Sequence, residues 1–121
     1  MATTNKTTQT YEIDAAGKSL GRIAAQAAKM LMGKTSAEYT PNILSDVKVH
    51  ITNAAKLSVR EKKAVQTKFT RYTGYPGGLK TVSLLQLNEK KPGEALRRAI
   101  ERMMPRNTFR NERMKNLIIK A

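Results

Sequence analysis

The chain has 121 residues and carries 23 lysines and arginines against 9 acidic residues, which gives a formal net charge of +14. A hydrophobic content of 40% supports one small core, so the chain is neither a disordered polycation nor a two-domain enzyme. It has no cysteine, and its single histidine is His50, which excludes thiolate zinc sites and removes most histidine-based metal and catalytic arrangements. We therefore expect no enzyme activity, no metal or other cofactor and no small-molecule substrate.

The positive charge is concentrated in the second half of the chain. Residues 1–59 hold 7 basic and 4 acidic side chains, whereas residues 60–121 hold 16 and 5. Such a field favours an anionic partner, and nucleic acid is the commonest one because each neutralised phosphate releases counterions. A basic surface that only keeps the protein soluble is the alternative. No apolar run could cross a bilayer and no secretory signal opens the chain, so we expect a cytoplasmic protein without a membrane partner.

The N-terminal half is predicted to contain two strands and one helix. Residues 1–10 are expected to form a flexible extension that precedes a single domain over residues 11–121. Alternating apolar residues indicate strands, and apolar residues at helical spacing indicate a helix. The predicted elements are a strand over 11–15, a helix over 20–32 that Gly33 ends, a polar loop over 34–46 and a strand over 47–51.

The C-terminal half is predicted to alternate strands and helices. We expect a basic connection over 60–64, a third strand over 67–73, a break at 75–78, a helix from Pro92 that ends before Pro105, a basic helix after Asn107 and a strand over 117–119. The segment around Ser83 fits either a short helix capped by Ser83 or a strand over 81–85. The buried stripe of the helix after Pro92 is expected to consist of Leu96, Ala99, Ile100 and Met103. Strands separated by helices favour parallel pairing, so the predicted fold class is α/β, a three-layer α/β/α domain around a mostly parallel, about four-stranded sheet.

The short motifs that could support catalysis are weak. Gly33-Lys34-Thr35 matches only the end of a phosphate-binding loop, and it closes a helix instead of opening one. His50 lies on the polar side of an alternating strand, where a solvent-facing histidine is the simpler interpretation. The carboxylates of Asp14, Glu38 and Asp46 are scattered, and no pair has a spacing suited to acid and base roles.

The most informative segment runs from Lys68 to Lys80, where basic residues flank a loop with three glycines, two tyrosines and a proline. Glycines let the backbone approach a partner closely and expose N–H groups that can hold an anion. Tyr72 and Tyr75 can stack on an unpaired base, as in single-stranded RNA recognition. Gly77, directly after Pro76, is expected at the third position of a type II turn. An ordinary hairpin-like loop is the alternative.

A second basic cluster lies near the C-terminus. Its members are Arg97, Arg98, Arg102, Arg106, Arg110, Arg113 and Lys115. Arg98 and Arg102 are four residues apart on one side of the predicted helix. Arg106, Arg110 and Arg113 are expected to share one face, which suits a phosphate backbone. The alternative is a solvated, partly paired helix face.

Four segments of the chain resemble, in order and over most of its length, the bacterial large-subunit ribosomal protein L13 family. They are Asp14-Ala15-Ala16-Gly17-Lys18-Ser19-Leu20-Gly21-Arg22-Ile23-Ala24, Asp46-Val47-Lys48-Val49-His50-Ile51-Thr52-Asn53-Ala54, Arg71-Tyr72-Thr73-Gly74-Tyr75-Pro76-Gly77-Gly78-Leu79-Lys80 and Met103-Met104-Pro105-Arg106-Asn107. The chain departs from the family at Tyr72, where histidine is usual, and at Arg102 and Arg110, where glycine is usual. It stops at Ala121, before the family's usual tail, whose contacts we expect to be absent or made otherwise.

The resemblance implies a mostly parallel α/β fold and a structural protein of the large ribosomal subunit in the cytoplasmic ribosome. Such a protein binds large-subunit ribosomal RNA, contacts neighbouring large-subunit proteins, supports subunit assembly and has no catalysis of its own. The alternative is a free-standing, nucleoid-type nucleic-acid-binding protein. The predicted RNA-binding residues are Lys34, Lys68, Arg71, Tyr72, Thr73, Gly74, Tyr75, Pro76, Gly77, Gly78, Lys80, Arg98, Arg102, Arg106, Asn107, Arg110, Arg113 and Lys115.

Overall fold

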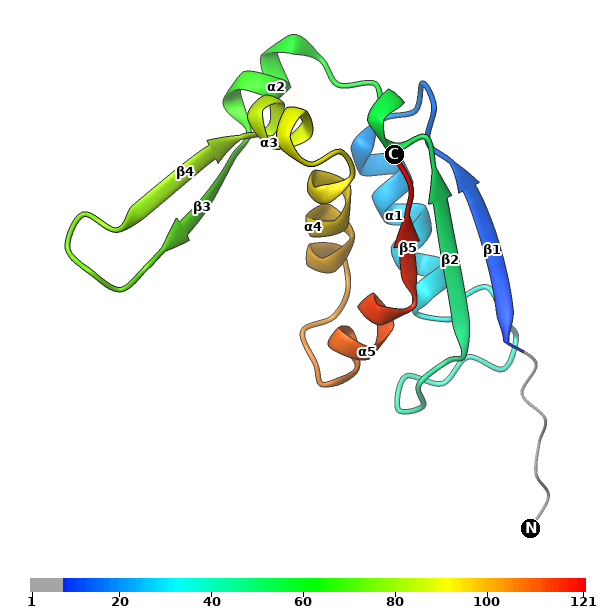
Figure 1. Cartoon of the computed structure of the whole chain (residues 1–121). Helices are drawn as coiled ribbons and strands as arrows, with labels where there is room; N and C mark the ends of the chain where they lie inside the picture. The colour runs from blue at the N-terminus through cyan, green and yellow to red at the C-terminus, as the bar shows by residue number, and fades with distance from the viewer. Residues whose placement is uncertain (1–7) are drawn as a thin grey trace.

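The computed structural model describes residues 8–121, whose elements are drawn in Figure 1. The strands are β1 (Gln9–Asp14), β2 (Val47–Thr52), β3 (Lys68–Tyr72), β4 (Leu79–Ser83) and β5 (Leu117–Ile119). The helices are α1 (Leu20–Leu31), α2 (Glu61–Gln66), α3 (Leu84–Lys90), α4 (Glu94–Met103) and α5 (Phe109–Lys115), with one turn of 3-10 helix, η1 (Ala54–Lys56), after β2. The extension expected over 1–10 lies mostly outside the described residues, and Gln9 and Thr10 belong to β1.

Three of the strands form a parallel sheet in the order β1-β2-β5. The central strand, β2, pairs with β1 from Gln9 beside Val47 to Asp14 beside Thr52, and with β5 where Val49 lies beside Leu117. Parallel neighbours need a crossover connection, which α1 supplies between β1 and β2. The α/β class and the parallel pairing predicted from the sequence are therefore confirmed.

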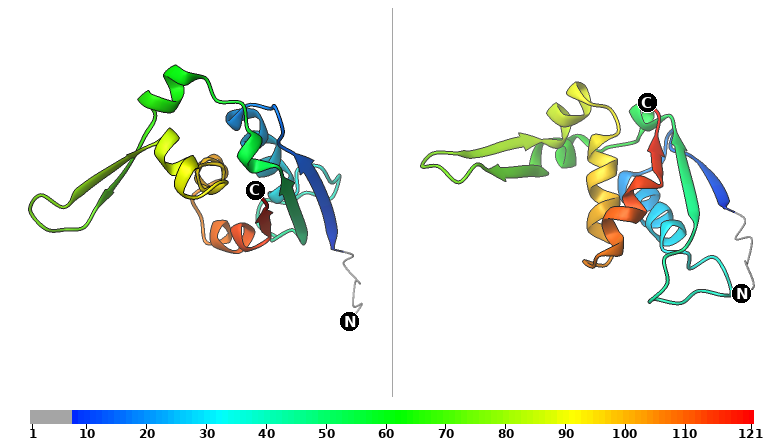
Figure 2. Two further views of the ribbon diagram at one scale, coloured as in Figure 1. Left: turned by 45° about the horizontal axis from the view of Figure 1, so that its top comes forward. Right: turned by 60° about the horizontal axis from the view of Figure 1, so that its bottom comes forward.

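The helices cover only one face of this sheet (Figure 1 and Figure 2). Val47, Val49 and Ile51 of β2 are buried on the inner face, where α1 packs against the sheet and α4 packs along α1. Lys48 and Ile118 are exposed on the outer face. Helices on both faces require strands that are apolar on both faces, whereas β2 alternates. The described chain thus has two layers at the sheet instead of the three expected from the sequence.

The predicted third strand does not join the sheet. It forms β3, which pairs with β4 in an antiparallel hairpin, and the hairpin projects from the body (Figure 1). Phe69 is the single buried residue of β3, so the strand has too little apolar surface for the centre of a sheet. The short glycine-rich connection also fits an antiparallel partner, since a parallel one requires a long crossover. The sheet has three strands as a result, instead of about four.

Two segments next to the hairpin also differ from expectation. The basic connection expected over 60–64 contains α2, because its residues are good helix formers and Glu61 suits the positive first turn. Both alternatives at Ser83 hold in part, since β4 ends at Ser83 and α3 follows it directly. The Ser83 hydroxyl accepts from the Gln86 N–H, and the Gln86 side chain accepts from the Ser83 N–H, both at 3.3 Å. This reciprocal pair fixes where the hairpin stops and the helix begins.

The buried side of α4 is shifted by one residue at its end. Leu96 and Ile100 are fully buried, as predicted, but Met103 is 45% exposed and Met104 is 3% exposed. The helix ends at Met103 and Met104 is extended, which turns the Met104 side chain into the core. No helix among residues 8–121 is long and apolar enough to cross a membrane.

Candidate nucleic-acid-binding surface

The hairpin of β3 and β4, residues 68–83, is called the hairpin arm below. Its base is fixed to the body, because Leu84 is fully buried and its N–H donates to the Thr67 carbonyl at 2.9 Å. Phe69 joins the same core, and α2 and α3 flank the base of the arm. Beyond Phe69, β3 and the tip are exposed. The arm therefore combines a rigid attachment with an open outer half.

The tip of the arm is a tight turn. The Gly78 N–H donates to the Tyr75 carbonyl at 2.9 Å and Gly77 has a φ of +71°, which is the type II turn that the sequence predicts. A side chain on Gly78 would collide with Thr73 Oγ1 and would lie 2.9 Å from the Tyr75 carbonyl oxygen. Tyr72 and Tyr75 are 66% and 75% exposed, so both rings are available for stacking. The other exposed residues of the tip are Thr73, Gly74, Pro76 and Gly77.

The outer half of the arm carries positive charge without a compensating acid. Arg71 and Lys80 are directly opposite each other in the register of β3 and β4, which places both side chains on one face. Like charges in this arrangement repel, and no acidic residue occurs between Lys68 and Ser83. An anion bound beside Arg71 and Lys80 would relieve the repulsion.

Two arginines of α4 pack over the base of the arm. The guanidinium carbons of Arg98 and Arg102 lie 5.4 Å and 5.2 Å from the centroid of the Phe69 ring, within the range of a cation–π contact. Arg98 also contacts Glu94 at 3.3 Å, a surface ion pair of small energy. Phe69 was not among the residues predicted from the sequence, although its place two residues before Arg71 on a strand puts both on one face. The structure places Phe69 opposite Val82 on the inward face of the hairpin.

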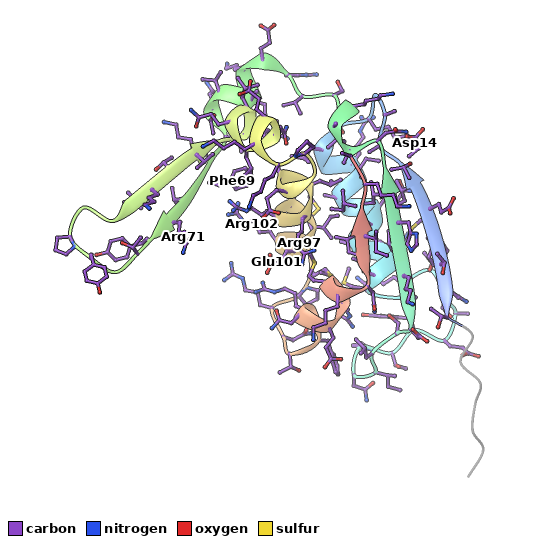
Figure 3. The ribbon with its side chains drawn as sticks, in the orientation of Figure 1. Asp14, Phe69, Arg71, Arg97, Glu101 and Arg102 are labelled. Carbon is purple, nitrogen blue, oxygen red and sulfur yellow. The ribbon has the colours of Figure 1, made fainter. Side chains whose placement is uncertain are left out.

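These contacts bring the two predicted basic clusters together on one surface. Arg71 shares the strand face of Phe69, and Arg102 packs on that ring from α4, so both lie on the side of the arm toward α4 (Figure 3). Lys80 and Arg98 extend the surface on either side. We call Arg71, Lys80, Arg98 and Arg102 the arm-base surface. Lys68 is exposed on the opposite face of the hairpin, so it lies outside this group.

The segment from Arg106 to Lys115, which includes α5, offers fewer unpaired charges to a partner than its sequence indicates. Arg106 and Asn107 are exposed, and the Asn107 side chain accepts from the Phe109 N–H at 3.1 Å, which caps α5. Arg110 lies 4.0 Å from Glu101. Lys115 lines a hollow of about 420 Å³ with Asp46 and Glu112, where negative charge weakens its attraction for phosphate.

Arg113 does not share an exposed face with Arg106 and Arg110. It is 2% exposed, its guanidinium lies 5.7 Å from the Phe109 ring centroid, and its Nε has no hydrogen-bond acceptor among the described residues. Arg106 precedes α5, which begins at Phe109, and within α5 the Arg113 side chain packs against the Phe109 ring on the buried side of the helix. The prediction that Arg113 belongs to a common basic face with Arg106 and Arg110 is therefore wrong.

Lys34 lies on another part of the molecule. It is exposed in the loop after α1, and its neighbour Thr35 makes a 3.1 Å hydrogen bond with the hydroxyl of Tyr11 in β1. The loop is therefore next to the sheet and not next to the hairpin arm (Figure 1).

One carboxyl group of the described chain has a clearly shifted pKa. The hydrogen bond from the Asn53 amide at 2.9 Å lowers the pKa of Asp14 most, and the Ala16 N–H and the charges of Lys18 and Lys56 lower it further. Asp14 joins the end of β1 to the residue after β2, so this carboxylate supports the fold. Within residues 8–121, no three histidine or acidic side chains lie close enough together to hold a metal ion.

Comparison with known proteins assigns the chain to a family. Residues 8–119 match the family described as Ribosomal protein L13. The large ribosomal subunit protein uL13 of Rubrobacter xylanophilus is 42% identical over 111 residues, which cover 92% of this chain and 78% of that protein. The uL13 proteins of Thermotoga maritima and Treponema pallidum are 40% and 42% identical, covering 92% and 90% of this chain and 74% and 77% of their own lengths. With this extent of similarity, the chain belongs to the ribosomal protein L13 family.

Proposed function

We propose that this chain is a structural constituent of the large ribosomal subunit, binds large-subunit ribosomal RNA and supports subunit assembly. The family match over residues 8–119 supports the ribosomal location in the cytoplasm and the presence of neighbouring large-subunit proteins. The proposed role is structural and requires no catalytic step.

The observation that carries the RNA-binding part of the proposal is the arm-base surface. Its four cations come from β3, β4 and α4, and among residues 8–121 the one ion pair that any of them forms is the partly exposed contact of Arg98 with Glu94. Two of its guanidinium groups are held over Phe69, which limits the conformational freedom that binding has to remove. Phosphate is the anion that a fixed group of arginines suits best in RNA, where shape and backbone contacts dominate.

In the proposed mechanism, the base and the tip of the arm contact different parts of the RNA. The arm-base surface binds phosphates and sets the orientation of the protein on folded RNA. The tip, with the exposed backbone of Gly74 and Gly77 and the exposed rings of Tyr72 and Tyr75, fits against unpaired nucleotides. Lys68, Arg106 and Lys115 add electrostatic attraction at longer range, while Lys34 would meet a different part of the partner.

A sucrose gradient tests the proposal against the alternative of a free-standing nucleic-acid-binding protein. We expect the tagged chain to sediment with large subunits at a stoichiometric level and to remain there at moderate salt. Sedimentation with the nucleoid fraction or as a free protein would contradict the ribosomal role.

A further inference from the structure

A second basic region lies at the start of α1 and shares no residue with the hairpin arm. A cleft of about 840 Å³ opens between the first turns of α1 and the segment from Ser58 to α2. Among the described residues, four cationic side chains line it, Lys18, Arg22, Arg60 and Lys63, and no acidic side chain does. None of the four was predicted from the sequence as a binding residue, because they come from two segments far apart in the chain.

Backbone hydrogen bonds hold the two sides of this cleft together. The Gly17 N–H donates to the Lys56 carbonyl at 3.0 Å, and the Ser58 N–H donates to the Lys18 carbonyl at 3.0 Å. The turn before α1 is therefore fixed to the segment that leads into α2. The cleft is a built feature of the body and does not depend on side-chain packing alone.

The cations of the cleft have no close acidic partner in the described part of the chain. Neither of the two ion pairs found within 4.0 Å among residues 8–121 includes any of the four. Asp14 is near enough to Lys18 for the lysine charge to lower the Asp14 pKa, but the Asp14 carboxylate already accepts hydrogen bonds from Asn53 and Ala16. Glu61 follows Arg60 and is exposed in the first turn of α2.

The first turn of α1 adds to the positive field. It contains no acidic residue, and the Ser19 side chain makes no capping hydrogen bond. The first helical hydrogen bond runs from the Ile23 N–H to the Ser19 carbonyl, so the preceding amides have no helical acceptor. This end of the helix thus reinforces the attraction that the four cations exert on an anion.

We propose that this cleft is a second binding site for the phosphate backbone of large-subunit ribosomal RNA. The inference rests on the proposed function, which supplies the polyanion. Lys63 lies on α2, and α2 leads within two residues into β3, so one folded RNA can reach both the cleft and the hairpin arm. A cleft of about 840 Å³ is much larger than a single phosphate ion, whereas a run of nucleotides matches its volume and its four cations.

Charge neutralisation tests the proposal. The triple variant Arg22→Gln, Arg60→Gln, Lys63→Gln changes three exposed side chains. We expect about a tenfold or larger loss of affinity for deproteinised large-subunit ribosomal RNA, with a salt slope smaller by about 2–3 units, since each phosphate contact contributes roughly 0.7–0.9. The matched control is Lys29→Gln, Lys48→Gln, Lys120→Gln, which removes the same charge from exposed positions outside the cleft.

Each outcome has a distinct meaning. A cleft variant that binds RNA as the control does would overturn the proposal and leave the proposed function intact. A cleft variant that binds RNA normally but fails to enter subunits would assign the cleft to an acidic protein neighbour, which also overturns it. Failure of the unmodified chain to bind the RNA or to sediment with large subunits would instead reject the proposed function.

A measurement on the unmodified chain guards against misfolding of the variants. Lysine acetylation of the free protein and of its complex with the RNA compares Lys63 with Lys48. We expect the RNA to protect Lys63 several-fold more than Lys48, and equal reactivity of Lys63 in both states would contradict the proposal.

Discussion

The parallel sheet and the hairpin arm are both built from short strands, but they use their side chains in opposite ways. In β2 every second residue is buried, and Val49 and Ile51 are fully inaccessible. In β3 only Phe69 is buried, and the residues beyond it face solvent. The sheet is stabilised by the apolar surface it buries, whereas the arm depends on its attachment at Phe69 and Leu84. The residues that are free to bind a partner are therefore concentrated where the fold needs them least.

The two regions also differ in charge. The outer face of the sheet carries charges of both signs, because Glu12 of β1 and Lys48 of β2 both lie on it. In the register of these strands, Glu12 lies beside His50 and Thr10 lies beside Lys48. The arm carries cations and no acid. A surface with mixed charge is typical of a solvated face. On a surface whose charges all have one sign, the charges repel one another, and a partner of opposite charge relieves this repulsion. The comparison predicts that substitutions in the buried core of the sheet and its helices change stability, whereas substitutions in the exposed half of the arm change binding.

The largest expected effect is on the stability of the body. Leu96→Ala removes a fully buried side chain of α4 and should lower the free energy of unfolding by about 2–5 kcal/mol. Leu79→Ala, at a 63% exposed position of the arm, should cost no more than about 0.5 kcal/mol. Urea denaturation measures both. Equal losses would contradict the division between the two regions.

The next effect is on RNA binding by the arm-base surface. The variant Arg71→Gln, Lys80→Gln, Arg102→Gln should reduce the slope of log affinity against log salt by about 2–3 units, because each lost phosphate contact contributes roughly 0.7–0.9. The control Lys29→Gln, Lys48→Gln, Lys120→Gln should change the slope less. An unchanged slope for the first variant would show that the arm-base surface makes no phosphate contacts.

Gly77→Val separates the tip of the arm from its attachment. A β-branched residue is strained at a φ of +71°, although a Cβ atom at this position would have no neighbour within 4 Å apart from the adjacent residues. We expect an unchanged circular-dichroism spectrum and a melting temperature lower by only a few degrees, of order 1 kcal/mol. Incorporation into large subunits, in competition with the unmodified chain, should fall clearly. Equal incorporation would mean that the tip is only a connector.

A smaller effect is expected for Arg113 and Arg106, which together test which arginines are available to bind phosphate. Arg113→Met replaces a buried cation whose Nε has no acceptor in the described chain, so stability should stay the same or rise. The salt slope should not change. Arg106→Gln, at an exposed position, should lower the slope by roughly 0.7–0.9 without affecting stability. A lower slope for the Arg113 variant would restore that residue to the binding surface.

The smallest expected effect concerns acid stability. The folded-state pKa of Asp14 is lower than the ordinary value of 3.8, so the ionised carboxylate contributes stability above that value. This contribution is lost as the pH falls from 3.8 through the lower folded-state pKa. The Asp14→Asn variant should therefore be less stable than the unmodified chain at neutral pH, and its stability should fall less than that of the unmodified chain on acidification. Denaturation at a series of pH values measures the difference, and parallel curves would contradict the assignment.

Elements with a clear period could be predicted from the sequence. The alternation of Val47, Val49 and Ile51 gave β2, and the helical spacing of Leu20, Ile23 and Leu31 gave α1, because each pattern is set by local geometry. The turn at Gly77 followed from the conformational requirement of a single residue. These features depend on neighbours in the chain and need no knowledge of tertiary contacts.

Features set by distant contacts could not be predicted in the same way. The short glycine-rich connection after β3 allows an antiparallel partner, but it does not exclude a place for β3 in the sheet, so the exposure of its outer half became clear only from its pairing with β4. The burial of Arg113 depends on which side of α5 packs against the body, and the sequence of a short, basic helix does not show this. The contact of Arg98 and Arg102 with Phe69 joins α4 to β3, so the spacing of the arginines indicated a cluster but not what holds it.

The order of strands in the sheet has a kinetic consequence. The hairpin arm pairs residues that are close in the chain, and such hairpins form in about 1–10 μs. The sheet places Val49 beside Leu117, so the intervening chain has to be closed into a long loop before this pairing can stabilise the sheet. Topologies with such distant partners fold slowly compared with local ones. We therefore expect the arm to be shaped early and the β2–β5 pairing to limit the rate at which the chain reaches its final structure.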